Sequence, residues 1–162
     1  MKLRITIVLL SIFSIAIVQS KNLIQNFDKQ NFYAVMKSGK TESVNDELDV
    51  ISTSAIREKE AYEGALLMRK AGVVKLPAQK LKLFKKGRIK LETALMNDNK
   101  NGEYHFLRLI IEEHAPKITK YNADLEADKE YIKKSFKGLS PVVQQAIIDY
   151  SKNSNILHPQ DF

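Results

Sequence analysis

The spacing of the apolar residues constrains the fold of this chain more than any other feature. From Asn22 onward they recur at intervals of three and four, and no run of alternating β-branched residues occurs. Such spacing gathers apolar side chains on one face of an α-helix, whereas a half-buried strand requires strict alternation. The sequence therefore predicts an all-α fold of about seven short helices, arranged as an irregular helical array or bundle with short connections.

Turn and capping residues divide this pattern into helices. Gly39 can close a first helix, while Pro77 and Pro141 suit the first position of two later ones. The segment Ser43–Asp46 has the form of a capping box. We expect helices at about 28–37, from the capping box onward, at about 55–71, at 77–97, at about 102–115, from Asn122 onward and at about 141–150.

The predicted third helix has a stripe of small residues and methionine. Small side chains allow the axis of a neighbouring helix to come close. We therefore expect a second helix to pack tightly against this stripe, which consists of Ala61, Gly64, Ala65 and Met68.

The first twenty residues have the three parts of a signal peptide. A short cationic start, Met1–Arg4, precedes an uncharged and mostly aliphatic run from Ile5 to Val18, and the exit ends in the small residue Ser20. This run of 14 residues is shorter than the roughly 20 that a spanning helix needs, so an uncleaved anchor is the less favoured alternative. We expect cleavage after Ser20, no membrane span in the remaining chain, and an extracytoplasmic location, either periplasmic or secreted.

Residues 21–162 are expected to form a single helical domain with a frayed tail from about residue 151. The chain contains no cysteine, so an exported domain of this sequence has no disulfide bonds and depends on burial for its stability. Without Lys2 and Arg4 it has 24 basic and 19 acidic residues, a formal charge of +5. The domain is therefore moderately basic.

Part of the predicted fourth helix resembles one helix of a known repeat. Its residues stand at the spacing of the second helix of a tetratricopeptide repeat, in which small, aromatic and small residues are followed by proline. Leu91 replaces the aromatic residue, Asn99 replaces the proline, and Pro77 stands where the first helix of the repeat is continuous. The resemblance implies a repeat-like helix pair inside the array and, by analogy, protein binding. The matching residues are Gly87, Leu91, Ala94, Leu95 and Asn99.

Most of the chain after the leader also resembles a family of small exported helical proteins of Bacteroidetes-type bacteria. The stretches that carry this resemblance are FLRLIIEEHAP, EYIKKSFKGLSPVVQQAI and DYSKNSNIL. The resemblance implies export and an all-helical fold, and it implies no activity.

The stretch GEYHFLRLIIEEHAP, residues 102–116, raises the question of a catalytic or metal site. On a helix, His105, Arg108 and Glu112 share one narrow polar strip, and apolar residues cover most of the circumference. His114 lies about 180° from His105, and two histidines four residues apart, as in zinc hydrolases, do not occur. We interpret the strip as a surface feature with an intrahelical ion pair and expect no metal. The alternative is a small enzyme whose site lies near these three residues.

Other catalytic patterns are also missing from the sequence. The chain has no Gly-x-Ser-x-Gly motif, no phosphate-binding glycine loop and no Cys–His pair. Its paired carboxylates stand mostly at predicted helix starts, where the helix dipole favours negative charge. The sequence therefore favours a protein without catalytic activity and without a cofactor.

The strongest charge feature lies on the predicted fourth helix. Between Lys75 and Lys90 there are seven basic residues and no acidic one. Lys82, Lys86 and Lys90 fall at successive i+4 positions with Lys85 beside them, so we expect these four lysines to be exposed and unpaired. The opposite side of the helix, which we expect to be buried, consists of Leu81, Phe84, Leu91 and Leu95.

These lysines have two interpretations. They form an ordinary solvated helix face, or they form a docking surface for an acidic protein or an anionic envelope component. Nucleic acid is not expected, because the chain is predicted to be exported and no aromatic residues alternate with the lysines. The sequence thus predicts an exported, non-catalytic binding or interaction module of the bacterial envelope, and it contains no signal for an oligomeric state.

Overall fold

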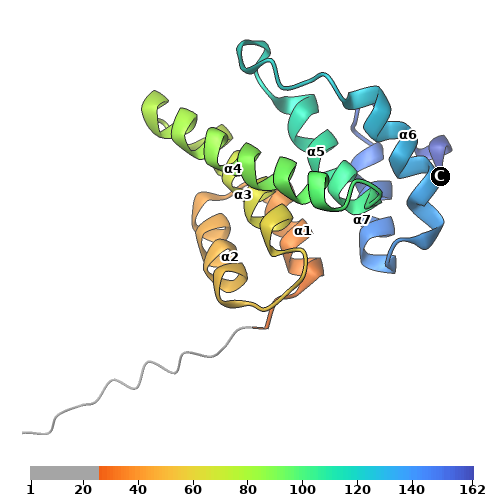
Figure 1. Cartoon of the computed structure of the whole chain (residues 1–162), viewed down its shortest axis with the longest axis horizontal. Helices are drawn as coiled ribbons and strands as arrows, with labels where there is room; N and C mark the ends of the chain where they lie inside the picture. Colours follow the sequence, from red (N-terminus) through yellow and green to blue (C-terminus); the bar gives the residue numbers. More distant parts are fainter. Residues whose placement is uncertain (1–25) are drawn as a thin grey trace, which may run out of the picture.

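The computed structural model describes residues 26–162 (Figure 1). These residues form α-helices and short 3-10 segments with no strand among them, which confirms the all-α prediction. The predicted signal peptide lies outside the described residues. No helix in the described part combines the length and the apolar character needed to cross a bilayer. The elements are α1 (Lys29–Ser38), α2 (Thr41–Thr53), α3 (Lys59–Val73), α4 (Pro77–Asn97), α5 (Gly102–His114), η1 (Lys117–Thr119), α6 (Leu125–Ser135), η2 (Phe136–Gly138), α7 (Pro141–Ser151) and η3 (Pro159–Asp161).

Local capping explains several helix ends. Asp28 caps α1 by accepting a hydrogen bond from the backbone N–H of Gln30 at 2.9 Å. Gly39 ends the same helix with a φ of 61°, a left-handed conformation that glycine adopts without strain. Pro77 opens α4 and Pro141 opens α7. These positions agree with the sequence prediction.

Other helix starts differ from the prediction. α2 begins at Thr41, before the predicted capping box, and its first turn includes Val44, which is fully buried. α3 begins at Lys59 rather than near residue 55 and continues through Gly72. α6 begins at Leu125 rather than directly after Asn122. Packing of the apolar face contributes more to helix stability than the capping signals on which these predictions relied.

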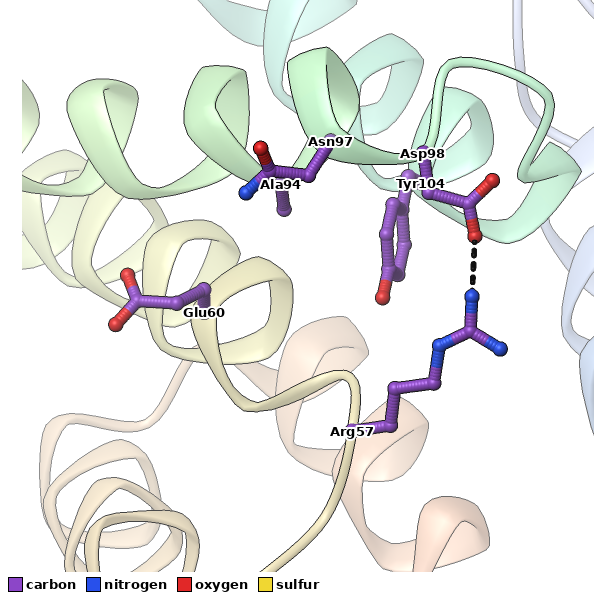
Figure 2. Close-up of a pocket in the computed structure, with 6 residues that line it drawn as sticks. All are labelled: Arg57, Glu60, Ala94, Asn97, Asp98 and Tyr104. Atoms are coloured by element: carbon purple, nitrogen blue, oxygen red, sulfur yellow. Dashed lines mark hydrogen bonds and ion pairs between the residues drawn. The ribbon is translucent and has the colours of Figure 1, made fainter.

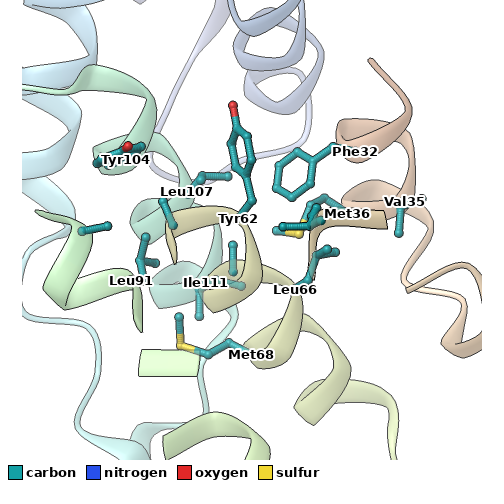
Figure 3. Packing of buried hydrophobic residues seen from close by; sticks show 14 of the residues in the cluster. Phe32, Val35, Met36, Tyr62, Leu66, Met68, Leu91, Tyr104, Leu107 and Ile111 are labelled. Carbon is teal, nitrogen blue, oxygen red and sulfur yellow. The ribbon is translucent and has the colours of Figure 1, made fainter. Parts of the chain in front are cut away.

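α3 lies at the centre of the larger hydrophobic core (Figure 3). Its Tyr62 and Leu66 are fully buried, and the ring of Tyr62 packs on that of Phe32 of α1 with centroids 4.4 Å apart. Leu107 and Ile111 of α5 pack into the same core. This core therefore joins the first five helices of the domain.

α3 and α4 form a helical hairpin whose two backbones are in direct contact. A Cβ atom on Gly64 would lie 2.7 Å from the backbone nitrogen of Leu91 and 2.8 Å from the carbonyl oxygen of Gly87. A Cβ atom on Gly87 would lie 2.6 Å from the carbonyl oxygen of Gly64. No side chain fits between the helices at this point. The predicted tight packing along the small-residue stripe is confirmed.

α5 also faces a second, smaller core. Its Phe106 and Leu109 are fully buried there against α6 and α7. Leu157, which follows α7 in the chain, is fully buried in the same core. The segment after residue 151 therefore packs against the domain, and the prediction that it is frayed is wrong.

Glu113 holds this last segment in place. Its carboxylate accepts hydrogen bonds from the hydroxyl of Tyr150, the hydroxyl of Ser154 and the backbone N–H of Asn155, each at 2.6 Å. Burial acts to raise the pKa of Glu113, but these three hydrogen bonds outweigh it and lower that pKa. The partner of the tail lies about forty positions earlier in the chain, where local sequence patterns cannot reveal it.

The helix crossing predicts opposite effects for two glycines of one hairpin. Gly87→Ala places a Cβ atom against the carbonyl oxygen of Gly64, so the helices must separate, and we expect a loss of about 1–3 kcal/mol in the free energy of unfolding. Gly72→Ala meets no atom within 4 Å and should stabilise by up to about 1 kcal/mol, because alanine favours the helix. Urea denaturation followed by circular dichroism measures both. A Gly87→Ala protein as stable as the wild type would contradict the contact.

Candidate functional site

The predicted polar strip on α5 is buried rather than exposed. His105 is 5% exposed and Glu112 is 2% exposed, and the side chain of Arg108 is 12% exposed. The interpretation of these residues as a surface strip is therefore wrong. α6 covers the strip, and the partners of the three side chains come from other parts of the chain.

Asp128 of α6 is the centre of this buried network. Its carboxylate is fully buried and accepts two hydrogen bonds from Arg108, one from Nε at 2.8 Å and one from Nη2 at 2.7 Å. Such paired contacts between a guanidinium and a carboxylate are the strongest form of this interaction. Burial acts to lower the pKa of Arg108, but the hydrogen bonds and charge of Asp128 outweigh it and raise that pKa. The pair fixes α6 on α5.

Both ring nitrogens of His105 face acceptors within the protein. Nδ1 lies 2.6 Å from Oδ1 of Asp128, and Nε2 lies 2.9 Å from the carbonyl oxygen of Asn99. A carbonyl oxygen can only accept, so Nε2 must donate there. The ring also stacks on Tyr131, with centroids 4.2 Å apart and an angle of 3° between the planes. His105 therefore has no ring nitrogen left for a substrate, and its contacts support a structural role.

The other histidine of α5 does not join this network. Nδ1 of His114 lies 3.0 Å from the carbonyl oxygen of Ile110 on its own helix and 3.4 Å from the hydroxyl of Tyr150. Within residues 26–162, no group of three or more His, Asp or Glu side chains is arranged to hold a metal ion. The described structure therefore does not bring the two histidines of this helix to a common site.

Glu112 is the unusual member of the buried strip. Its Oε2 accepts a hydrogen bond from the backbone N–H of Asp124 at 3.0 Å, while its Oε1 is buried without a partner in the described part of the chain. Burial raises the pKa of Glu112 to about 7, and the nearby charges of Asp124 and Asp128 act in the same direction. Protonation of Glu112 is therefore coupled to folding.

Glu103, which the sequence analysis did not single out, ties three helices together. Its carboxylate accepts hydrogen bonds from the hydroxyl of Tyr33 at 2.9 Å and that of Tyr62 at 2.7 Å, and Nζ of Lys29 lies 2.8 Å away. Burial, together with the charge of Glu103, raises the pKa of both tyrosines well above its usual range. The one sequence signal for this role is an acid directly before the most apolar stretch of α5.

The predicted lysine face of α4 is confirmed at three of its four positions. Lys82, Lys85 and Lys86 are exposed, and none of them has an ion pair or hydrogen bond with another described residue. Lys90 is different, because its Nζ lies 2.9 Å from Glu60 and 2.8 Å from Glu63 of α3. The prediction that Lys90 is unpaired is therefore wrong. We call Lys82, Lys85 and Lys86 the cationic face.

The opposite side of α4 is buried only over its second half. Leu91 and Leu95 lie in the larger core as predicted, and Phe84 is half-buried against the ring of Tyr121, with centroids 5.6 Å apart. Leu81 is 56% exposed, so the prediction that it is buried is wrong. The first turns of α4 extend beyond the neighbouring helices, so no element covers them (Figure 1).

A small pocket lies at the other end of α4 (Figure 2). It has a volume of about 230 Å³, and Tyr104 points its hydroxyl into it. Burial raises the pKa of Tyr104 to about 12, and the charges of Glu58 and Asp98 add to this effect. Arg57 at the rim is already paired with Asp98 at 3.0 Å.

The pocket offers little to a charged ligand. Both carboxylate oxygens of Glu60 accept hydrogen bonds from Nζ of Lys90 at 2.9 Å. The guanidinium of Arg57 likewise donates to Asp98. The hydroxyl of Tyr104 remains without a hydrogen-bond partner among the described residues. The pocket is therefore a weaker candidate for a binding site than the cationic face.

The described residues thus define an all-α array with a buried polar network and one cationic helix face exposed to solvent. Comparison of the chain with protein-family models, with curated proteins and with solved structures gave no match. The choice between a binding module and an enzyme must therefore be argued from the chemistry of these residues alone.

The pair of Arg108 and Asp128 predicts a large cost for a small change. Asp128→Asn keeps the size of the side chain but leaves a buried guanidinium without its counter-charge, so we expect a loss of about 3 kcal/mol in the free energy of unfolding. The matched control is Asp149→Asn, which removes an exposed partner of Lys152 and should change stability little. Thermal denaturation measures both. Equal melting temperatures for the two variants would refute the structural role of Asp128.

The raised pKa of Glu112 predicts a pH-dependent effect of Glu112→Gln. A group with a raised folded pKa favours folding below its unfolded pKa, near 4.5, and loses this advantage as the pH rises through about 7. The stability of Glu112→Gln relative to the wild type should therefore increase by up to about 3 kcal/mol between pH 4.5 and pH 8. Urea denaturation across this pH range measures the difference in the free energy of unfolding between the variant and the wild type. The contributions of the other titrating groups are the same in both proteins and cancel in this difference. Parallel stability curves would contradict the burial of an unsatisfied carboxyl.

Proposed function

We propose that the protein is an exported, non-catalytic interaction module that binds an anionic partner through the cationic face of α4. The observation that supports this most is the exposure of Lys82, Lys85 and Lys86 without counter-charges from other described residues. Most of the other charged clusters of the domain are paired, including those around Asp128 and Glu103. The three uncompensated lysines of α4 lie close together on one face of a single helix.

The charge around this face extends over the whole end of the α3–α4 hairpin. Between Glu63 and Glu92 the chain contains no acidic residue. Unpaired cations attract anions over about a Debye length, roughly 8 Å at physiological salt. An anionic envelope component or an acidic protein is therefore attracted by Lys82, Lys85 and Lys86, whereas Glu60 and Glu63 compensate Lys90. The basic residues of this region are Arg69, Lys70, Lys75, Lys80, Lys82, Lys85, Lys86, Arg88 and Lys90.

Export is the second part of the proposal and rests on the leader alone. The basic start, the apolar run and the small exit residue of residues 1–20 support it. Export places the cationic face among the anionic components of a cell envelope, periplasmic or extracellular.

The alternative function, a small enzyme with a site near His105, Arg108 and Glu112, has less support. Both ring nitrogens of His105 and the guanidinium of Arg108 contact protein acceptors. A catalytic acid or base must reach a substrate proton, directly or through one water. Buried residues whose polar atoms are already committed meet this requirement poorly.

Charge reversal on the cationic face tests the binding proposal. The triple variant Lys82→Glu, Lys85→Glu, Lys86→Glu should lose retention on a polyanionic resin at low salt, because it replaces three unpaired cations with anions. Its melting temperature should change little, because exposed substitutions usually alter stability by less than about 0.5 kcal/mol each. Retention of the wild type should weaken as salt rises.

A matched control separates the face from net charge. Lys100→Glu, Lys117→Glu, Lys134→Glu changes the net charge equally at exposed lysines that lie outside α4. This control should keep most of the retention. If both triple variants lose retention equally, or neither does, the cationic face is not the binding surface.

A further inference from the structure

The end of the α3–α4 hairpin combines its lysines with exposed aliphatic side chains. Leu76, in the connection between the helices, is 67% exposed, and Leu81 of α4 is 56% exposed. Val73, at the end of α3, is 36% exposed. Figure 1 shows the first turns of α4 extending beyond the neighbouring helices. We call these three residues, with Lys75 and Lys80 between them, the hairpin tip.

We propose that the hairpin tip docks on a lipid bilayer that carries anionic headgroups, with Leu76 and Leu81 entering the interface. This inference rests on the proposed function and names the partner of the cationic face. Lys75, Lys80 and Lys82 contact the headgroups, and the leucines between them contact the acyl boundary. Lipid-surface segments of proteins combine these two kinds of side chain.

The aliphatic residues distinguish a bilayer from a hydrophilic polyanion. A polysaccharide or a polyphosphate interacts with lysines through charge and gives Leu76 and Leu81 nothing apolar to contact. A bilayer interface removes both leucines from water while the flanking ammonium groups stay at the headgroups, because long lysine stems allow this separation. The two exposed leucines between Lys75 and Lys82, each next to a lysine, therefore fit a lipid surface better.

The shape of the tip distinguishes a bilayer from an acidic protein. A protein partner would need a pocket that matches a protruding end, whereas a bilayer yields around it. The sequence between Glu63 and Glu92 also contains no acid that could meet a lysine or arginine of a partner. A continuous anionic surface is complementary to such an end.

The close helix crossing holds the tip in position. Gly64 and Gly87 bring the two backbones together behind the tip, and Met68 fills the contact beside them. Leu81 is therefore presented on a helix of this pair, and Leu76 stands directly before that helix, so little ordering is needed upon binding. We expect peripheral, reversible and salt-sensitive attachment, since the tip has few apolar residues and no aromatic anchor.

Vesicle binding of the full chain tests this inference. The wild type should sediment with vesicles of phosphatidylcholine mixed with phosphatidylglycerol, and much less with phosphatidylcholine alone. Leu76→Ser, Leu81→Ser should lower the partition coefficient for the anionic vesicles roughly tenfold, while its retention on a polyanionic resin stays unchanged. The control Met96→Ser alters an exposed apolar residue at the opposite end of α4 and should bind like the wild type. All variants share the rest of the chain, so any vesicle binding by segments outside the hairpin tip is the same in each of them.

A direct reporter of insertion is available because the chain contains no tryptophan. The fluorescence of Leu76→Trp should shift to the blue upon addition of anionic vesicles, while that of Met96→Trp should not. Melting curves by circular dichroism establish that all variants fold.

The outcomes separate this inference from the proposed function. Two results would overturn the bilayer as partner and leave the proposal for the cationic face intact. One is retention on the resin without vesicle binding, and the other is that the double variant Leu76→Ser, Leu81→Ser binds vesicles as well as the wild type. Absence of both resin retention and vesicle binding would overturn both proposals.

Discussion

The backbone contact between Gly64 and Gly87 is the constraint on which the domain depends. It sets the distance between α3 and α4, and α3 is the centre of the larger core. It also fixes which residues of α4 face inward, because Leu91 packs directly behind the crossing. The side of α4 that faces away from this contact is the cationic face. A single steric requirement thus connects the core of the domain with its candidate binding surface.

Buried carboxylates provide the second level of organisation. Glu103 connects α1 and α3 to α5, Asp128 connects α6 to α5, and Glu113 holds the last segment of the chain. Each has several donors, which offsets the cost of removing a charge from water. Glu112 lacks a partner at one oxygen, and burial, with the nearby charges of Asp124 and Asp128, raises its pKa. In a chain without cysteine, these acids hold the elements that apolar packing alone leaves less specified.

The sequence predicted those features that depend on local periodicity. The all-α class, the bounds of α4 and the stripe that includes Gly64 follow from residue spacing and from proline and glycine. A helical projection contains no information on neighbours, however. It could not reveal that Glu60 and Glu63 of α3 pair with Lys90. Nor could it reveal that no neighbouring helix covers Leu81, or that α6, with Asp128, covers the strip around His105. Predictions failed where the partner lay on another helix.

The segregation of charge along the hairpin makes it an electric dipole. Acidic residues stand at the end where α3 begins and α4 finishes, and the opposite end carries only basic ones. An external field of negative charge exerts a torque on such an object and turns its basic end forward before any contact forms. For the docking proposed above, we therefore expect ionic strength to act on the association rate constant and the short-range contacts of Leu76 and Leu81 to govern dissociation. Glu63 and Asp98 add little to this dipole, because Lys90 and Arg57 pair with them, so its strength comes from the unpaired lysines of the basic end.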